Sequence, residues 1–196
     1  DELFWGYPTW KHLLGLQRKG DRIPSTLLKK LGTRILLHSK RRFGFGVERL
    51  RRMGEGQPLF WGGAEAFTQA QKQRLLSPRL RQRLCGLTSW EALDPIYRRF
   101  RDKAWEPSTL HWMSYLDLNL RLPELLLMRV DKMSMGVSLE CRVPFLDHKL
   151  VELAMSIPES LKTRTGTLKY VLKKSVRGLI PDEIIDSARV YGANEW

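Results

Sequence analysis

The stretch T-L-K-Y-V-L-K-K-S-V-R-G-L-I-P, residues 167–181, indicates most clearly how this chain folds. Its apolar and small positions recur every three or four residues, as on the buried face of a helix, and they are Leu168, Val171, Leu172, Ser175, Val176 and Leu179. The opposite face carries Lys169, Lys173 and Arg177. Thr167 is placed as the N-cap, and Gly178 and Pro181 lie near the end. The pattern predicts a helix over 168–179.

The same period recurs in earlier segments, and helices are expected over 25–41, 68–76 and 89–100. Asp147 can cap a further helix that ends before Pro158, with its apolar positions at Leu150, Val151, Ala154 and Ile157. The alternation typical of strands appears only briefly, around 137–143. The sequence therefore predicts a mainly α fold in a single domain, residues 1–196.

Composition and cysteine usage narrow the class of protein. The chain has 196 residues, of which 42% are apolar and 28% charged, and this is a globular composition. Its longest aliphatic run, Leu125 to Met128, is far shorter than the roughly 20 apolar residues that span a bilayer. No charged-then-apolar leader opens it, so we expect a soluble, cytoplasmic protein without a membrane partner. Cys85 and Cys141 suggest neither a disulfide nor a zinc site, and we expect reduced, buried thiols.

The positive charge is confined to one half of the chain. Residues 1–103 hold 22 Lys and Arg against nine acids, a difference equal to the whole net charge of +13, whereas residues 104–196 are balanced. The basic half could meet nucleic acid, an anionic substrate or an acidic neighbour, or it could be a solvated helical surface. A nucleic-acid-binding module would use the basic and aromatic residues Lys40, Arg41, Arg42, Phe43, Phe45, Arg49, Arg51 and Arg52.

At the start of the sequence, two acids precede an aromatic, glycine-containing turn in D-E-L-F-W-G-Y, residues 1–7. Charged residues also gather in three later segments with apolar surroundings, R-V-D-K-M-S-M at 129–135, L-E-C-R-V-P-F-L-D at 139–147 and T-L-K-Y-V-L-K at 167–173. Buried charges are costly unless they are paired. The segments therefore indicate either a structural network of ion pairs or a site for a polyanion, and spacing alone leaves both open.

These four segments, in this order, closely resemble the synthetase domain of the glutamine-hydrolysing asparagine synthetases and their β-lactam synthetase relatives. The dense part of the resemblance covers 117–186, and 10–105 match only loosely. The resemblance implies that this chain is the helical C-terminal portion of an α/β ATP-pyrophosphatase domain. It also implies two partners that are not in this sequence, an upstream glutaminase domain and the half of the synthetase domain that carries an S-G-G-x-D-S phosphate loop.

The resemblance further implies an ATP-dependent amidotransferase that uses Mg²⁺. Such a ligase activates a small carboxylate, by default aspartate, as an acyl-adenylate, and it forms an amide with ammonia from glutamine while AMP and pyrophosphate are released. The isolated chain is expected to be inactive. The alternatives are the basic nucleic-acid-binding module, which is not favoured, and a noncatalytic relative. The oligomeric state is left open.

Individual roles follow from the resemblance residue by residue. Asp1 matches a magnesium ligand, although a helix cap or a chain terminus would explain it as well. Lys169 and Arg129 match positions that bind ATP, and Lys169 could instead belong to a solvated helix face. The charged residues Asp131, Glu140 and Arg142 match positions that line or brace the site, and we favour a buried bracing network.

The sequence departs from the family at two positions. Arg189 falls where a catalytic lysine is expected in the loop that closes the site, and a planar guanidinium keeps the charge of that lysine without its shape. Trp5 stands where the family usually has glycine, and we expect it to place a bulky group beside Asp1.

Overall fold

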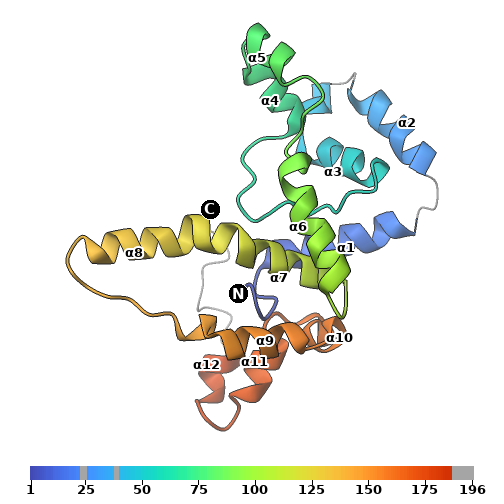
Figure 1. Ribbon diagram of the computed structural model, residues 1–196. Helices are drawn as coiled ribbons and strands as arrows, with labels where there is room; N and C mark the ends of the chain where they lie inside the picture. The colour runs from blue at the N-terminus through green and yellow to red at the C-terminus, as the bar shows by residue number, and fades with distance from the viewer. Residues whose placement is uncertain (23–25, 38–39, 187–196) are drawn as a thin grey trace.

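The computed structural model describes residues 1–22, 26–37 and 40–186 and shows an almost entirely helical chain (Figure 1). Within these ranges no residue belongs to a strand, and a single isolated bridge joins Arg177 to Ile180. The prediction of a mainly α fold is confirmed. The α-helices are α1 Pro8–Asp21, α2 Thr26–Leu37, α3 Phe45–Gly54, α4 Gln69–Leu75, α5 Pro78–Arg83, α6 Trp90–Lys103, α7 Thr109–Asn119, α8 Met128–Met135, α9 His148–Ser156, α10 Glu159–Lys162, α11 Tyr170–Ser175 and α12 Asp182–Asp186.

Shorter turns of helix connect these elements. They are the 3₁₀ segments Lys40–Phe43, Pro144–Leu146 and Arg164–Gly166, and the π-helical segment Leu122–Leu127 between α7 and α8. The π-helical segment contains Pro123, whose missing N–H cannot continue an α-helical ladder. No described helix is long and apolar enough to cross a membrane.

The main core forms where α1, α6 and α7 meet. Trp10, Phe100 and Trp112 are each at most 3% exposed, and the Trp112 indole N–H donates to the Phe60 carbonyl at 2.9 Å. A smaller cluster places Leu3 and Phe4 against Ala154 of α9. The N-terminal segment is thus fastened between the body of the molecule and α9.

Local signals predicted the starts of α2, α4, α6 and α9 to within about a residue. The Asp147 side chain accepts a hydrogen bond from the Lys149 N–H and caps α9 as expected. Thr68 caps α4 in a reciprocal capping box with Gln71.

The helix predicted over 168–179 is wrong in its extent. α11 covers only Tyr170–Ser175, and Thr167 does not cap it. The helix begins after Lys169 because this residue has a φ of 57°, in the left-handed region that interrupts a right-handed helix. The expectation of buried thiols is also wrong, since Cys85 and Cys141 are both free and exposed.

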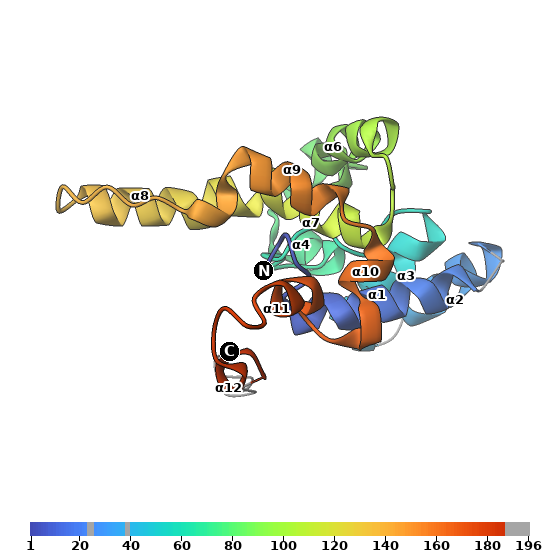
Figure 2. The ribbon, with the colours of Figure 1, turned by 90° about the horizontal axis from the view of Figure 1, so that it is seen from below.

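An arm formed by residues 128–143 projects from the body in both views (Figures 1 and 2). It consists of α8 and the extended segment that returns toward α9. Its apolar side chains are exposed to an unusual degree, and they include Val130 at 45%, Met133 at 77%, Val137 at 76% and Leu139 at 58%. Several exposed apolar side chains on one segment are typical of a part that packs against another body.

Candidate functional site

The structure brings together the first and last of the four charged segments. The Asp1 carboxylate and the Lys169 ammonium form an ion pair, and the two side chains are 35% and 32% exposed. The Lys169 N–H also donates to the Trp5 carbonyl at 3.4 Å. Two residues separated by 168 positions, each of which the resemblance assigns to the ATP site, therefore lie in contact.

The backbone of the first segment forms a tight turn beneath this pair. The Gly6 N–H donates to the Asp1 carbonyl at 3.0 Å and closes the turn. A Cβ at position 6 would lie 2.7 Å from Cε of Lys169 and would also collide with the Asp1 carboxylate. Position 6 therefore has no room for a side chain while the ion pair is intact.

Trp5 does not occupy the place that the sequence suggested. Its side chain is 2% exposed and belongs to the main core cluster with Trp10 and Trp112. Its φ is 56°, a left-handed conformation that glycine adopts without cost. The backbone of the turn thus explains why glycine would fit at this position, and the indole is directed into the core.

A second charged network supports the same turn. The Tyr7 hydroxyl donates to Oε1 of Glu2 at 2.7 Å, and the Ser114 hydroxyl donates to the Glu2 carbonyl at 2.6 Å. Burial acts to raise the pKa of Glu2, but the bonds from Tyr7 and the backbone outweigh burial and lower this pKa. Burial and the bond to Glu2 raise the pKa of Tyr7 to about 12. The phenol therefore stays a donor across the physiological range.

The network continues to Asp117 of α7 and to Arg121, which lies two residues beyond the end of this helix. The Arg121 guanidinium lies 5.0 Å from the centre of the Tyr7 ring, and its Nη1 donates to Oδ2 of Asp117 at 3.3 Å. The Gly63 N–H donates to the other oxygen of Asp117 at 3.0 Å. Asp117 is fully buried, and burial raises the pKa of this carboxyl despite both donors.

Sequence reasoning assigned no role to Asp117 or Arg121. An available signal was their i, i+4 spacing, with an aspartate amid the apolar residues of 110–120. A lone carboxylate in such surroundings is costly unless it has a partner.

The second and third charged segments, 129–135 and 139–147, do not form a buried network beside the Asp1–Lys169 pair. Arg129 and Asp131 are exposed on α8, and neither side chain makes a hydrogen bond or ion pair within the described ranges. Glu140 and Arg142 form the expected ion pair, but they are 67% and 84% exposed. The prediction of a buried network is wrong because the arm projects from the body, and among the described residues no other element covers its outer part (Figure 2).

Arg189 lies outside the described residues. Nor does the described part of the chain contain a group of three or more acidic, histidine or cysteine side chains that could hold a metal. Asp1 therefore offers a single carboxylate and not a complete magnesium site.

Two arginines of the basic half are engaged inside the protein. Nη2 of Arg51 lies 2.7 Å from Oε1 of Glu48, and Arg52 is 2% exposed with its guanidinium 3.8 Å from the centre of the Trp61 ring. Nη1 of Arg52 also pairs with Glu65 at 2.6 Å. These contacts make Arg51 and Arg52 structural residues of α3 and remove them from a surface that could grip nucleic acid.

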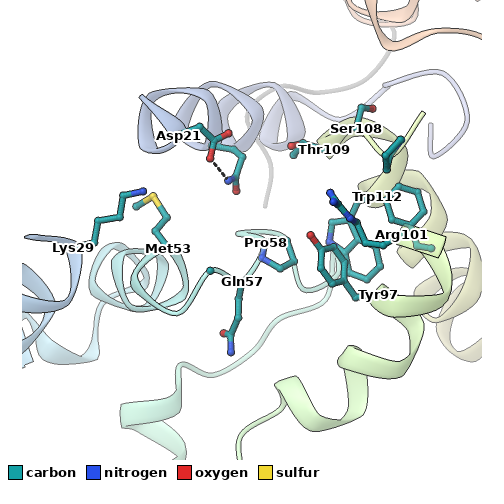
Figure 3. Close-up of a pocket in the computed structure, with 14 residues that line it drawn as sticks. Asp21, Lys29, Met53, Gln57, Pro58, Tyr97, Arg101, Ser108, Thr109 and Trp112 are labelled. Carbon is teal, nitrogen blue, oxygen red and sulfur yellow. Dashed lines mark hydrogen bonds between the residues drawn. The ribbon is translucent and has the colours of Figure 1, made fainter. Parts of the chain in front are cut away.

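A polar cavity of about 360 Å³ lies elsewhere, between α1, α6 and the start of α7 (Figure 3). Figure 3 shows Tyr97 and Arg101 on one side and Lys29 on the other. The Asp21 carboxylate in its wall accepts a hydrogen bond from Gln17 at 2.9 Å. None of the site residues predicted from the sequence lines this cavity.

Comparison with known proteins shows to which protein family the chain belongs. The family model described as asparagine synthase matches residues 1–191, and the chain belongs to this family. The chain is 31% identical over 197 residues to the glutamine-hydrolyzing asparagine synthetase 1 of Bacillus subtilis, a match that covers 97% of this chain and 28% of that protein. No solved structure was found to match the chain.

Two further similarities are shorter. The chain is 50% identical over 60 residues to asparagine synthetase 3 of Bacillus subtilis, which covers 31% of this chain and 10% of that protein. It is 34% identical over 106 residues to the amidase chyE of Penicillium rubens, which covers 50% of this chain and 16% of that protein. The chain thus spans between a quarter and a third of the length of the first of these relatives and less of the others.

Proposed function

We propose that this chain is the helical C-terminal part of an ATP-dependent amidotransferase. The reaction activates a carboxylate, by default aspartate, as an acyl-adenylate with release of pyrophosphate, and ammonia from glutamine then displaces AMP to form the amide. Family membership and the similarity to asparagine synthetases support this reaction class. The observation that carries the proposal is the contact between Asp1 and Lys169.

The two side chains form a pair of opposite charges that suits a metal–phosphate ligand. Both are about one-third exposed, so solvent and ligands can reach them. Lys169 would leave the carboxylate and place its ammonium on a phosphate oxygen, where a cation stabilises the charge that develops as pyrophosphate leaves. Asp1 would contribute one oxygen ligand to magnesium, which prefers hard carboxylate and phosphate oxygens.

The remaining predicted site residues lie on or beside the arm. Arg129 would contact ATP, and Asp131, Glu140 and Arg142 would line or brace the site once the arm is covered. The exposed apolar side chains of the arm support docking of the phosphate-loop half of a synthetase domain on this face. A glutaminase domain would complete the enzyme, and Arg189 would act in the loop that closes the site.

The proposal is tested in a chimeric protein in which this chain replaces the matching segment of the Bacillus subtilis relative. Magnesium-dependent exchange of pyrophosphate into ATP reports adenylation. We expect Lys169→Ala to lower the exchange rate by about 100-fold, as when a donor to developing charge is removed. Lys174→Ala is the matched control, since this lysine is exposed on α11, the helix that begins directly after Lys169.

Two outcomes would contradict the proposal. The first is a folded chimera without any exchange activity. The second is an equal loss of activity in the Lys169 and Lys174 variants, because a general effect of positive charge would explain it without a phosphate contact.

A further inference from the structure

A large apolar cavity lies between α6, α7 and α9, away from the Asp1–Lys169 pair. Its volume is about 570 Å³, and neither residue of that pair lines it. Figure 2 shows α6 and α9 on the same side of α7, and residues of all three helices line the cavity. Ligand pockets of proteins have volumes of roughly 300–1,000 Å³, so the cavity is large enough for a small organic molecule.

The walls of the cavity are mostly apolar. Phe100 of α6, Leu118 of α7 and Met155 of α9 line it, and the π-helical segment adds Leu122 and Leu127. Leu118, Leu127 and Met155 are only half-buried, so part of their apolar surface is open to a ligand. Removal of such surface from water is favourable by about 25 cal/mol per Å². The cavity therefore favours a hydrocarbon group.

A hydrogen bond joins two walls of the cavity. The indole N–H of Trp105, in the connection between α6 and α7, donates to the Met155 carbonyl at 3.0 Å. Both residues line the cavity. The bond ties the α6–α7 connection to α9 before any ligand arrives, and a preformed site lowers the cost of ordering on binding.

Arg99 of α6 brings a positive charge to the cavity. Its Nε donates to the Tyr115 hydroxyl at 2.7 Å, and its Nη2 donates to Oδ1 of Asn119 at 3.0 Å. Both acceptors are neutral, and no carboxylate pairs with Arg99 in the described part of the chain. A guanidinium has five N–H groups, and the two used here leave three for an anionic ligand. The two neutral contacts thus hold a cation in place without neutralising it.

Lys103 adds a second positive charge one turn further along α6. It is exposed, lines the cavity and makes no hydrogen bond or ion pair within the described ranges. Residues four apart on a helix are neighbours on its surface, so Arg99 and Lys103 present two cations side by side. Arg98 differs from both, since it does not line the cavity and pairs with Asp94 at 2.6 Å.

Two carboxylates also line the cavity, but neither pairs with these cations. Oε2 of Glu106 accepts the Glu159 N–H at 2.9 Å and lies 3.2 Å from Nδ1 of His111. Glu152 is exposed on α9, where water and salt screen its charge. The acids of the cavity therefore leave the positive charge of α6 available.

We propose that this cavity binds a small amphipathic carboxylate, such as a medium-chain fatty acid. The hydrocarbon chain lies against Leu118, Leu127 and Met155, and the carboxylate accepts hydrogen bonds from Arg99 beside the Lys103 ammonium. The volume would hold roughly 19 water-sized groups at about 30 Å³ each, so dodecanoate is small enough to enter. This inference does not depend on the proposed enzymatic function.

Calorimetry with dodecanoate and the 196-residue chain tests the proposal, at concentrations too low for micelles. We expect saturable binding at one site with a negative heat-capacity change, because apolar surface is buried. Arg99→Met removes the donors while keeping an unbranched side chain, and it should weaken binding by about tenfold. Arg98→Met is the matched control and should leave binding unchanged, since Arg98 is exposed on the same helix outside the cavity.

Two further comparisons separate the head group from the hydrocarbon chain. Dodecanol lacks the charge and should bind the parent chain about tenfold more weakly than dodecanoate does. Met155→Trp should fill the cavity and abolish binding of both. The dodecanol comparison uses the unmodified chain, so it holds even where a variant does not fold.

Three outcomes would overturn the proposal. The first is the absence of saturable dodecanoate binding. The second is dodecanol binding as tight as that of dodecanoate, because the cations of α6 would then play no part. The third is equal weakening in the Arg98 and Arg99 variants, since general attraction to a basic surface would explain it without a site.

Discussion

Replacing Lys162 with methionine should stabilise the fold at neutral pH, although it removes a charged residue from a charged cluster. The Lys162 side chain is 1% exposed, and its ammonium finds no hydrogen-bond partner in the described part of the chain. Burial lowers its pKa from 10.5 to about 8, with attraction to Glu106 acting in the opposite direction. This difference in pKa means that burial in the folded protein disfavours the charged form over the neutral form by about 3 kcal/mol.

The direction in which folding stability changes with pH follows from the numbers of protons that Lys162 binds in the folded and unfolded chains. Below pH 8 the lysine is protonated in both the folded and the unfolded chain, and the folded state bears the full cost of the buried ammonium. Between about pH 8 and 10.5 the unfolded chain binds more protons, so stability rises with pH. Above this window the amine is neutral in both states, and the cost disappears.

Urea unfolding of the 196-residue chain measures the effect. Methionine has a similar length and no charge, so Lys162→Met should raise the free energy of unfolding by up to about 3 kcal/mol at pH 7 and by much less at pH 10. Lys174→Met, at an exposed position of α11, is the control and should change little. A Lys162→Met chain that is less stable than the parent at pH 7, or equally stabilised at both pH values, would refute the reasoning.

Four further outcomes are expected. Gly6→Ala should lower stability by less than about 1 kcal/mol in urea unfolding, because flexible side chains can move aside, yet it should reduce pyrophosphate exchange in the chimera by displacing Lys169. Arg52→Met should destabilise the chain by about 3–5 kcal/mol in the same assay, since it leaves Glu48 buried without one partner. Arg142→Ala should change the unfolding free energy by at most about 1 kcal/mol, because its ion pair is exposed. Calorimetry with Mg-ATP should detect no tight binding to the isolated chain, whereas binding lost on Lys169→Ala would place the phosphate site within it.

The sequence predicted helices correctly where their ends are set by neighbouring residues, such as a capping side chain or a proline. Asp147 caps α9 because its side chain reaches the N–H two residues on, and Pro158 lies two residues after Ser156, the last residue of this helix. The boundary of α11 could not be found in this way. The left-handed backbone of Lys169 accompanies contacts with Trp5 and Asp1, which lie more than 160 positions away in the sequence.

Only part of the candidate site could be predicted, because the rest also depends on contacts between residues that are far apart in the sequence. The motifs identified Asp1 and Lys169 through resemblance, and the structure brings them into contact. The buried state expected for Glu140 and Arg142 was wrong, since the sequence does not reveal that the arm projects from the body. The Asp117–Arg121 pair was missed because its burial depends on packing of α7 against residues near Gly63.

Trp5 shows how tertiary packing can override a strong local preference next to the candidate site. A left-handed conformation costs a non-glycine residue about 1–2 kcal/mol, and Trp5 adopts it with a φ of 56°. Burial of a large aromatic side chain is worth about 3–5 kcal/mol by comparison with alanine, and the indole of Trp5 is 2% exposed within the main core. Burial therefore outweighs the backbone cost, and it fixes the turn in the conformation in which Asp1 faces Lys169. The same residue that departs from the glycine of the family thus anchors the turn to the core, and its strained backbone accepts the bond from the Lys169 N–H.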